Sequence, residues 1–119
     1  MIWQVEIEDK KYVWDESFEY ANKLNRENYG GYDNWRVPTI EELRTILTKE
    51  SFENKQSFTG TTYIKKPLLE SMTDYQWFWS STENTNDSSR RAWFLDFKRG
   101  IGNYYYKSGE YYVRCVEGR

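Results

Sequence analysis

The C-terminal third of the chain constrains the fold most, because short apolar runs alternate there with turn residues. Aromatic and aliphatic side chains dominate the runs 77–79, 92–98, 101–106 and 111–117. The breaks between these runs are the Ser-, Thr- and Asn-rich stretch 80–90, the pair 99–100 and the segment 107–110, which contains Gly109. Short strands joined by tight turns with glycine are typical of an antiparallel meander.

An alternating segment opens the chain. Residues 2–7 place Trp3, Val5 and Ile7 on one side and polar side chains on the other. This period of two predicts a half-buried strand, which a polar turn at 8–11 should end.

A helix is expected to follow that turn. Apolar residues recur at helical spacing, as Trp14, Phe18, Ala21 and Leu24. Asp15 and Glu16 favour the first turn of this helix because carboxylates stabilise its positive end. The pair 30–31 consists of glycines, and we expect it to end the helix.

A second helix should begin after Pro38. Thr39 and Glu42 form the T-x-x-E capping box, and the apolar stripe behind it is Ile40, Leu43, Ile46 and Leu47. Residues 50–76 are polar and irregular, apart from the short apolar pieces 63–64 and 68–69, and are predicted to be a long loop. Helices early and a meander late predict one α+β domain over residues 1–119.

Aromatic side chains supply most of the burying power. Apolar residues make up 38% of the chain and aromatic residues 19%, and the mean hydropathy is −0.99. Eleven Tyr and six Trp exceed what the core of a 119-residue domain needs. We therefore expect some of these rings at the surface, where rigid amphipathic side chains make good contact residues.

Composition excludes several classes of function. The net charge is −2, so no electrostatic footprint for nucleic acid is present, and no apolar run is long enough for membrane insertion. The chain has no histidine, which removes Ser-His-Asp triads and histidine metal sites. Cys115 is the single cysteine, so no internal disulfide can form. We expect no cofactor, no metal and no enzymatic activity.

Four blocks stand in a specific order along the chain. They are DNWRVPTIEEL at 33–43, WFWSSTE at 77–83, AWFLDFKRG at 92–100 and YYVRCVE at 111–117. With the Trp-Gln strand at 3–4 and the Trp-Asp-Glu helix start at 14–16, they cover nearly the whole chain. In this order they resemble the C-terminal domain family of the Legionella collagen-like protein (Lcl).

The resemblance implies a C-type-lectin-like fold, related to the formylglycine-generating enzymes, with two helices packed on a small, mostly antiparallel sheet with long loops. It implies a non-enzymatic bacterial adhesion domain whose partner is a glycan or a protein surface. Stalked relatives are trimers, which makes a homo-oligomer one expectation. Similar C-terminal segments occur in the variable proteins of diversity-generating retroelements, and a diversified recognition protein is the alternative function.

Two departures from the family pattern bear on localisation. Ala21 stands where many relatives have a cysteine that could pair with the C-terminal one, and Met1 stands where relatives have a few more residues. A complete chain of this kind fits the cytoplasm, whereas a domain cut from a longer protein fits the cell surface or secretion. The sequence leaves both open.

The Tyr-rich strands and the loop before them form the predicted ligand-binding surface, because Tyr and Ser with a few charges are typical of adaptable contact surfaces. The predicted contact residues are Glu83, Asn84, Arg90, Lys98, Asn103, Tyr104, Tyr105, Tyr106, Lys107, Ser108, Glu110 and Tyr111. Tyr112 belongs to the same run. The alternative is that these tyrosines pair across strands and only stabilise the sheet.

Oxygen-bearing side chains near 80–90 raise two further hypotheses. Glu83 and Asp96 could form a carboxylate pair for glycoside cleavage. Alternatively, Glu83, Asn84, Asn86 and Asp87 could hold calcium, although the Glu-Pro-Asn and Trp-Asn-Asp signatures of calcium-dependent lectins are missing.

Three other residue types have a structural and a functional interpretation. Arg36 is either a structural donor or an anion binder, and we favour the first. Trp77, Trp79 and Trp93 either stack on sugars or fill the core, and we favour the core. Cys115 is best explained as a small buried residue, because no histidine is available to activate it.

Overall fold

The computed structural model describes residues 1–8, 10–53, 61–64, 77–84, 86 and 90–118, with only the backbone described for 48–53 and 61–64. It is an α+β domain, as predicted. The helices are α1 (Trp14–Arg26), the 3-10 turn η1 (Tyr29–Gly31) and α2 (Ile40–Arg44). The strands are β1 (Ile2–Trp3), β2 (Trp35–Arg36), β3 (Leu47–Glu53), β4 (Thr61–Ile64), β5 (Trp77–Glu83), β6 (Arg91–Asp96), β7 (Ile101–Tyr106) and β8 (Val116–Glu117).

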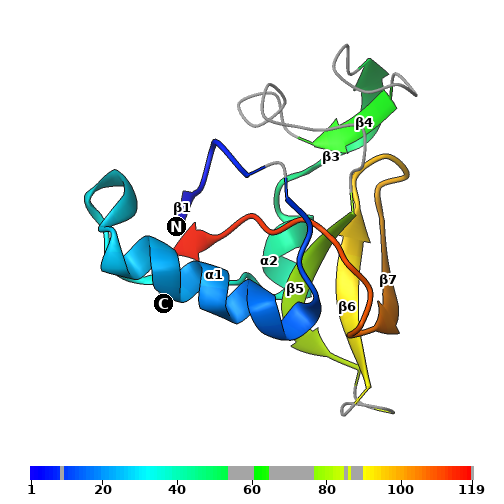
Figure 1. Cartoon of the computed structure of the whole chain (residues 1–119). Helices are drawn as coiled ribbons and strands as arrows, with labels where there is room; N and C mark the ends of the chain where they lie inside the picture. The colour runs from blue at the N-terminus through cyan, green and yellow to red at the C-terminus, as the bar shows by residue number, and fades with distance from the viewer. Residues whose placement is uncertain (9, 54–60, 65–76, 85, 87–89, 119) are drawn as a thin grey trace.

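The strands form three small antiparallel sheets, in the orders β1-β8-β2, β3-β4 and β5-β6-β7 (Figure 1). The first sheet joins the two ends of the chain, because β8 lies between β1 and β2. The third sheet is the predicted meander, and β7 is one of its edges. In the part of the chain described, no helix has the length and apolarity needed to cross a bilayer.

Helix α1 packs the predicted apolar stripe inward, with Trp14, Ala21 and Leu24 buried. Its first turn carries Asp15 and Glu16, and Glu16 Oε1 accepts a hydrogen bond from the Val13 N–H. The prediction that the glycine pair ends this helix was wrong, since α1 ends at Arg26. The glycines instead adopt positive φ angles in η1, a conformation that glycine tolerates without steric cost.

Helix α2 begins at the predicted capping box. Thr39 Oγ1 accepts from the Glu42 N–H at 3.1 Å, and Glu42 Oε1 accepts from the Thr39 N–H at 2.8 Å. The helix is shorter than the apolar stripe, because it ends at Arg44 and Leu47 already belongs to β3.

The prediction of a loop over 50–76 was wrong in part. Strands β3 and β4 occupy 47–53 and 61–64 and pair antiparallel, with Leu47 opposite Ile64. Backbone pairing needs no apolar side chains, so polar strands such as these leave little trace in the hydropathy pattern. The apolar pair 68–69 lies outside the described residues.

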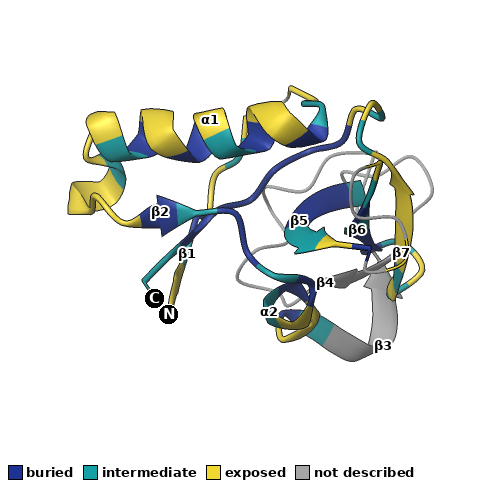
Figure 2. Cartoon of the chain, turned by 90° about the horizontal axis from the view of Figure 1, so that it is seen from below, coloured by how far each residue is buried: buried dark blue, intermediate teal, exposed yellow. Residues whose placement is uncertain are grey.

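The meander separates two apolar clusters. Trp79, Phe94 and Tyr111 belong to the cluster under α1, whereas Phe78 and Leu95 belong to the cluster around α2. Figure 2 shows the same order, with α1 and α2 on opposite sides of β5 and β6. Strand alternation in 77–79 explains this division, because Trp79 and Phe78 are both buried but on different faces.

The predicted strands at the two ends of the chain are wrong in extent. β1 ends at Trp3, and Gln4 rather than Val5 turns inward, with exposed fractions of 2% and 53%. Gln4 Oε1 accepts from the Cys115 N–H at 2.9 Å, and Gln4 Nε2 donates to the Tyr20 hydroxyl at 2.6 Å. A polar side chain is buried here because its hydrogen bonds are satisfied by α1 and by the C-terminal segment.

The segment 111–117 is not one strand. Tyr111 and Tyr112 form isolated bridges to Tyr12 and Phe78, and regular pairing resumes only in β8. The chain thus passes from the meander to the terminal sheet along a buried path.

Candidate ligand-binding site

A pocket of about 430 Å³ opens beside β7 and the turn that follows it. Phe94 and Tyr111 are buried and Trp77 is half-buried, whereas the Tyr105 ring is 51% exposed. We call this hollow the tyrosine pocket, and its lining residues are Trp77, Phe94, Asn103, Tyr104, Tyr105, Gly109, Glu110 and Tyr111. Its volume lies at the lower end of the range for small-molecule sites.

Strand register explains why these side chains converge. Phe94 lies opposite Asn103 and Ala92 lies opposite Tyr105, so these four share one face of the sheet. Phe94 is in ring contact with Tyr111 at 4.8 Å between centroids.

Tyr111 is held in place by its backbone and by a second ring. Its N–H donates to the Tyr12 carbonyl at 3.0 Å, and the Tyr12 N–H donates to the Tyr111 carbonyl at 2.7 Å. Trp77 packs on the Tyr111 ring at 5.4 Å and 85°. The ring is therefore a fixed part of the pocket.

The turn after β7 closes the pocket, and Gly109 makes this closure possible. The Gly109 N–H donates to the Tyr106 carbonyl at 2.9 Å. A Cβ atom at this position would lie 3.1 Å from Tyr105 Cδ2, 3.3 Å from the Tyr106 carbonyl oxygen and 3.4 Å from the Tyr111 ring. Any side chain here would push against both rings.

The consecutive tyrosines of β7 point to different faces. The Tyr106 ring lies under the Arg91 guanidinium at 4.7 Å, and the Tyr104 ring contacts Trp93 at 5.2 Å. Alternation places Tyr105 on the other face, toward the pocket. All three are exposed, at 40% for Tyr104, 51% for Tyr105 and 44% for Tyr106, and β7 is the exposed edge strand in Figure 2.

Two polar side chains stand among the rings of the pocket. Asn103 Oδ1 accepts from the Tyr104 N–H at 2.8 Å. Glu110 is exposed on the turn after β7. The pocket can therefore offer ring surfaces and one carboxylate.

The remaining predicted contact residues are not all at this pocket. Lys107 Nζ binds Glu83 Oε2 at 2.8 Å and lies 4.2 Å above the Trp14 ring, so Lys107 has a structural role. Asn84 is buried, and its Oδ1 accepts from the Asn86 N–H.

Arg90, Lys98 and Ser108 lie outside the pocket lining as well. Arg90 and Ser108 are exposed near the turn after β7, whereas Lys98 lies in the turn between β6 and β7, at the opposite end of the strands. The predicted loop 80–90 begins later than expected, because β5 continues to Glu83. Within the predicted set, the structure thus gathers Asn103, Tyr104, Tyr105, Glu110 and Tyr111 at one hollow.

The hypothetical carboxylate pair does not converge. Glu83 lies opposite Ala92 on β6, and Asp96 lies four residues further along that strand. At a rise of about 3.4 Å per residue this separates the two backbone positions by roughly 13 Å, beyond the range of glycosidase pairs. Asp96 instead accepts from the backbone N–H groups of Lys98 and Arg99 and pairs with the Arg99 side chain.

The hypothetical calcium ligands are not assembled among the described residues, in which no group of three acidic, His or Cys side chains could hold a metal. Glu83 is engaged by Lys107, and Asn84 caps its own turn. Asp87 lies outside the described residues.

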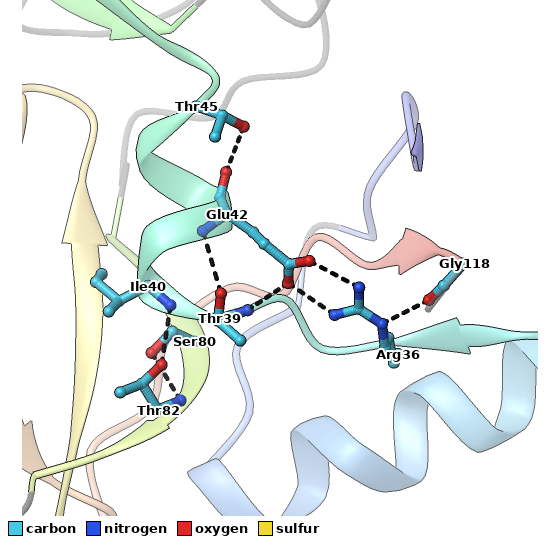
Figure 3. Close-up of polar contacts among 8 residues, drawn as sticks. All are labelled: Arg36, Thr39, Ile40, Glu42, Thr45, Ser80, Thr82 and Gly118. Carbon is cyan, nitrogen blue, oxygen red and sulfur yellow. Dashed lines mark hydrogen bonds and ion pairs between the residues drawn. The ribbon is translucent and has the colours of Figure 1, made fainter.

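Arg36 has the structural role that we favoured. Its Nη1 and Nη2 donate to the two Glu42 carboxylate oxygens at 2.7 Å each, and its Nε donates to the Gly118 carbonyl at 2.6 Å (Figure 3). Glu42 also belongs to the capping box, so the Arg36–Glu42 pair joins β2, α2 and Gly118. The Arg36 guanidinium is the main cause that lowers the pKa of Glu42 from 4.5 to about 2.

Cys115 is buried, which raises its thiol pKa to about 12. A thiol of this pKa carries almost no thiolate at neutral pH and is a poor nucleophile.

The sequence argument missed three lining residues, Trp77, Phe94 and Gly109. Phe94 could have been found from the meander itself, since pairing 101–106 against 91–96 places it opposite Asn103. Trp77 and Trp93 were expected in the core and are only half-buried, whereas Trp79 is fully buried.

The fold and the pocket together define a small α+β domain with a fixed aromatic surface beside an exposed edge strand. The sequence model of the Lcl C-terminal domain matches residues 1–117, and the chain belongs to this family. A search among curated proteins gives no match. The family places the chain among surface or adhesion-type domains.

Proposed function

We propose that this domain is a non-enzymatic binding module on a C-type-lectin-like scaffold, and that it recognises a glycan or a protein surface through the tyrosine pocket. The observation that carries the proposal is the pocket itself, with five aromatic residues and one carboxylate around about 430 Å³. A hollow of this size accepts one group of a larger ligand, such as a single sugar ring or side chain.

The chemistry of the lining supports recognition over catalysis. Rigid rings bury a large contact area at a small cost in side-chain entropy, and Tyr105 is exposed enough to meet a ligand directly. Asn103 and Glu110 supply hydrogen-bonding groups that could fix the orientation of the ligand. The separation of Glu83 and Asp96 along the sheet supports binding over glycoside cleavage.

A glycan array tests this proposal, and the chain offers a matched pair of variants. Tyr105→Ala removes a ring from the pocket, whereas Tyr106→Ala removes a similarly exposed ring that lies outside the pocket lining, under Arg91, and touches the Tyr105 ring only at its edge, at 5.5 Å between centroids. We expect the wild-type domain and Tyr106→Ala to bind the same subset of glycans, and Tyr105→Ala to lose that binding. Loss in Tyr106→Ala alone would refute the pocket as the site.

Two further arms of the array separate the remaining alternatives. Binding should survive EDTA, because the proposal needs no metal. Binding that disappears in EDTA would restore the cation hypothesis for 83–87. If no glycan on the array binds, the test is repeated with protein partners. We then expect the wild type and Tyr106→Ala to capture the partner and Tyr105→Ala to fail.

The second candidate is the variable protein of a diversity-generating retroelement. It is favoured by the division of the Tyr-rich segment, in which residues 103–106, 108 and 110 are exposed and 111–116 are buried. Side chains of the exposed part could vary without disturbing the core. A reverse-transcriptase gene and a near-identical template repeat beside the coding sequence are the expected observation, and their absence would remove this candidate.

A further inference from the structure

The charge that lines the tyrosine pocket is negative. Among the described residues that line it, Glu110 is the only one that is charged at neutral pH, and no ion pair in the described part of the chain engages it. Nearby cations are directed elsewhere, because Lys107 binds Glu83 and Arg91 lies over Tyr104 and Tyr106 on the opposite face. An anionic group in the pocket would therefore meet a carboxylate and no lining cation.

Aromatic rings that differ in orientation line the same pocket. The planes of Trp77 and Tyr111 are 85° apart, and those of Phe94 and Tyr111 are 54° apart. Ring faces carry negative electrostatic potential and attract a cation within about 6 Å. Several rings that differ in orientation, with a carboxylate at the side, are the arrangement that recognises alkylammonium groups.

The few charged hydrogen-bond acceptors in the tyrosine pocket favour a quaternary over a primary ammonium group. A primary ammonium has three N–H donors to satisfy, and leaving them unpaired in an aromatic pocket is costly. Asn103 Oδ1 already accepts from the Tyr104 N–H, and Glu110 is the only charged acceptor among the described lining residues, beside the neutral tyrosine hydroxyls. A quaternary ammonium has no N–H group and needs only ring contact and a compensating charge.

We propose that the tyrosine pocket binds a quaternary ammonium group, such as the trimethylammonium end of choline. This inference rests on the proposed function, since it names the chemical group that the same pocket accepts. The group could be carried by a choline-bearing glycan or lipid, or by a trimethylated lysine, and all of these present the same trimethylammonium end.

The test is a titration of the full 119-residue chain with choline and with 3,3-dimethylbutan-1-ol, which replaces the nitrogen by carbon and removes the charge. The Trp77 indole N–H signal and the amide signals of 103–111 report binding in a ¹H–¹⁵N spectrum. We expect choline to bind at least about tenfold more tightly than the neutral analogue, a difference of about 1.4 kcal/mol, since the rings and Glu110 attract the cation. Equal affinity for the two, or no binding of choline, would overturn the inference.

Three variants test whether choline binds in the tyrosine pocket. Glu110→Gln should weaken choline binding several-fold and leave the neutral analogue unchanged, and Tyr105→Ala should weaken both. Tyr106→Ala should behave as wild type, and a loss in this variant would contradict the assignment to the pocket. Phosphocholine and trimethyllysine, titrated separately, distinguish a choline-bearing partner from a methylated protein.

The outcomes separate this inference from the proposed function. If choline fails to bind while a ligand from the glycan array still depends on Tyr105, the inference falls and the binding function stands. If the array ligands bind equally well to the wild type and to Tyr105→Ala, the proposed function is refuted, whether or not choline binds.

Discussion

Neutralising Glu42 should destabilise the domain at neutral pH and much less in acid. The Glu42 side chain is 18% exposed and is held by both Arg36 Nη atoms at 2.7 Å. Its pKa falls from 4.5 to about 2 on folding. Each pKa unit corresponds to about 1.4 kcal/mol, so the ionised carboxylate contributes roughly 3 kcal/mol, or about 2 kcal/mol after allowance for its partial contact with solvent.

The sign of the pH dependence follows from the lowered pKa. Because the folded state holds the carboxylate more strongly ionised, its contribution is complete above the unfolded pKa of 4.5 and is lost as the pH falls toward 2. Glu42→Gln should therefore reduce the free energy of unfolding by about 2 kcal/mol at pH 7, and by less than about half of that at pH 3.

Urea denaturation followed by tryptophan fluorescence at pH 7, 4 and 3 measures this difference. The control is Glu41→Gln, which removes an exposed carboxylate from the same first turn. It should cost only the helix-dipole contribution of about 0.3–1 kcal/mol. A Glu42→Gln effect that is the same at pH 7 and pH 3 would refute the reasoning, because it would come from packing and not from ionisation.

Three further results are expected. Thr39→Ala should cost about 1 kcal/mol in urea denaturation, since it removes the acceptor of the Glu42 N–H in the first turn of α2, and an unchanged midpoint would contradict this role. Lys107→Met should cost about 1 kcal/mol, because it removes the ion pair with Glu83 and the cation above Trp14, and the loss should shrink in high salt. Cys115 should not react with a disulfide reagent at pH 8 until urea unfolds the domain, because burial raises its pKa to about 12, and rapid labelling of the folded domain would contradict its burial.

Local signals in the sequence predicted the parts of the fold that depend on neighbouring residues. The T-x-x-E motif locates the start of α2, because a capping box closes within one helical turn. The WFW alternation assigns Phe78 and Trp79 to opposite faces, because strand geometry alone decides this.

Features decided by distant contacts could not be predicted in this way. Arg114 is buried because its Nη1 donates to the carbonyls of Gln4 and Val5, more than a hundred residues away in sequence. Tyr111 is buried for a similar reason, since its backbone bridges to Tyr12. The tyrosines of 104–112 look alike in the sequence. Tyr111 and Tyr112 are buried, and Tyr104 to Tyr106 are exposed, because the chain passes between the sheets only after β7.

The sequence predicted the segment that contains the candidate site but not which of its residues line the pocket. Asn103, Tyr105 and Glu110 were expected from the Tyr-rich segment, and they do line one pocket. Glu83 and Lys107 had the right residue types but neutralise each other in an ion pair. Side chains with charges attract partners within the fold as readily as ligands, and sequence alone does not say which.

The most direct test of the central claim is a ¹H–¹⁵N spectrum of the labelled domain with and without the ligand that the array or the titration identifies. The account predicts that the perturbed signals are the Trp77 indole N–H and the amides of 103–111. Perturbations that instead gather around the apolar hollow between α1 and β2, lined by Phe18, Trp35 and Val37, would contradict it.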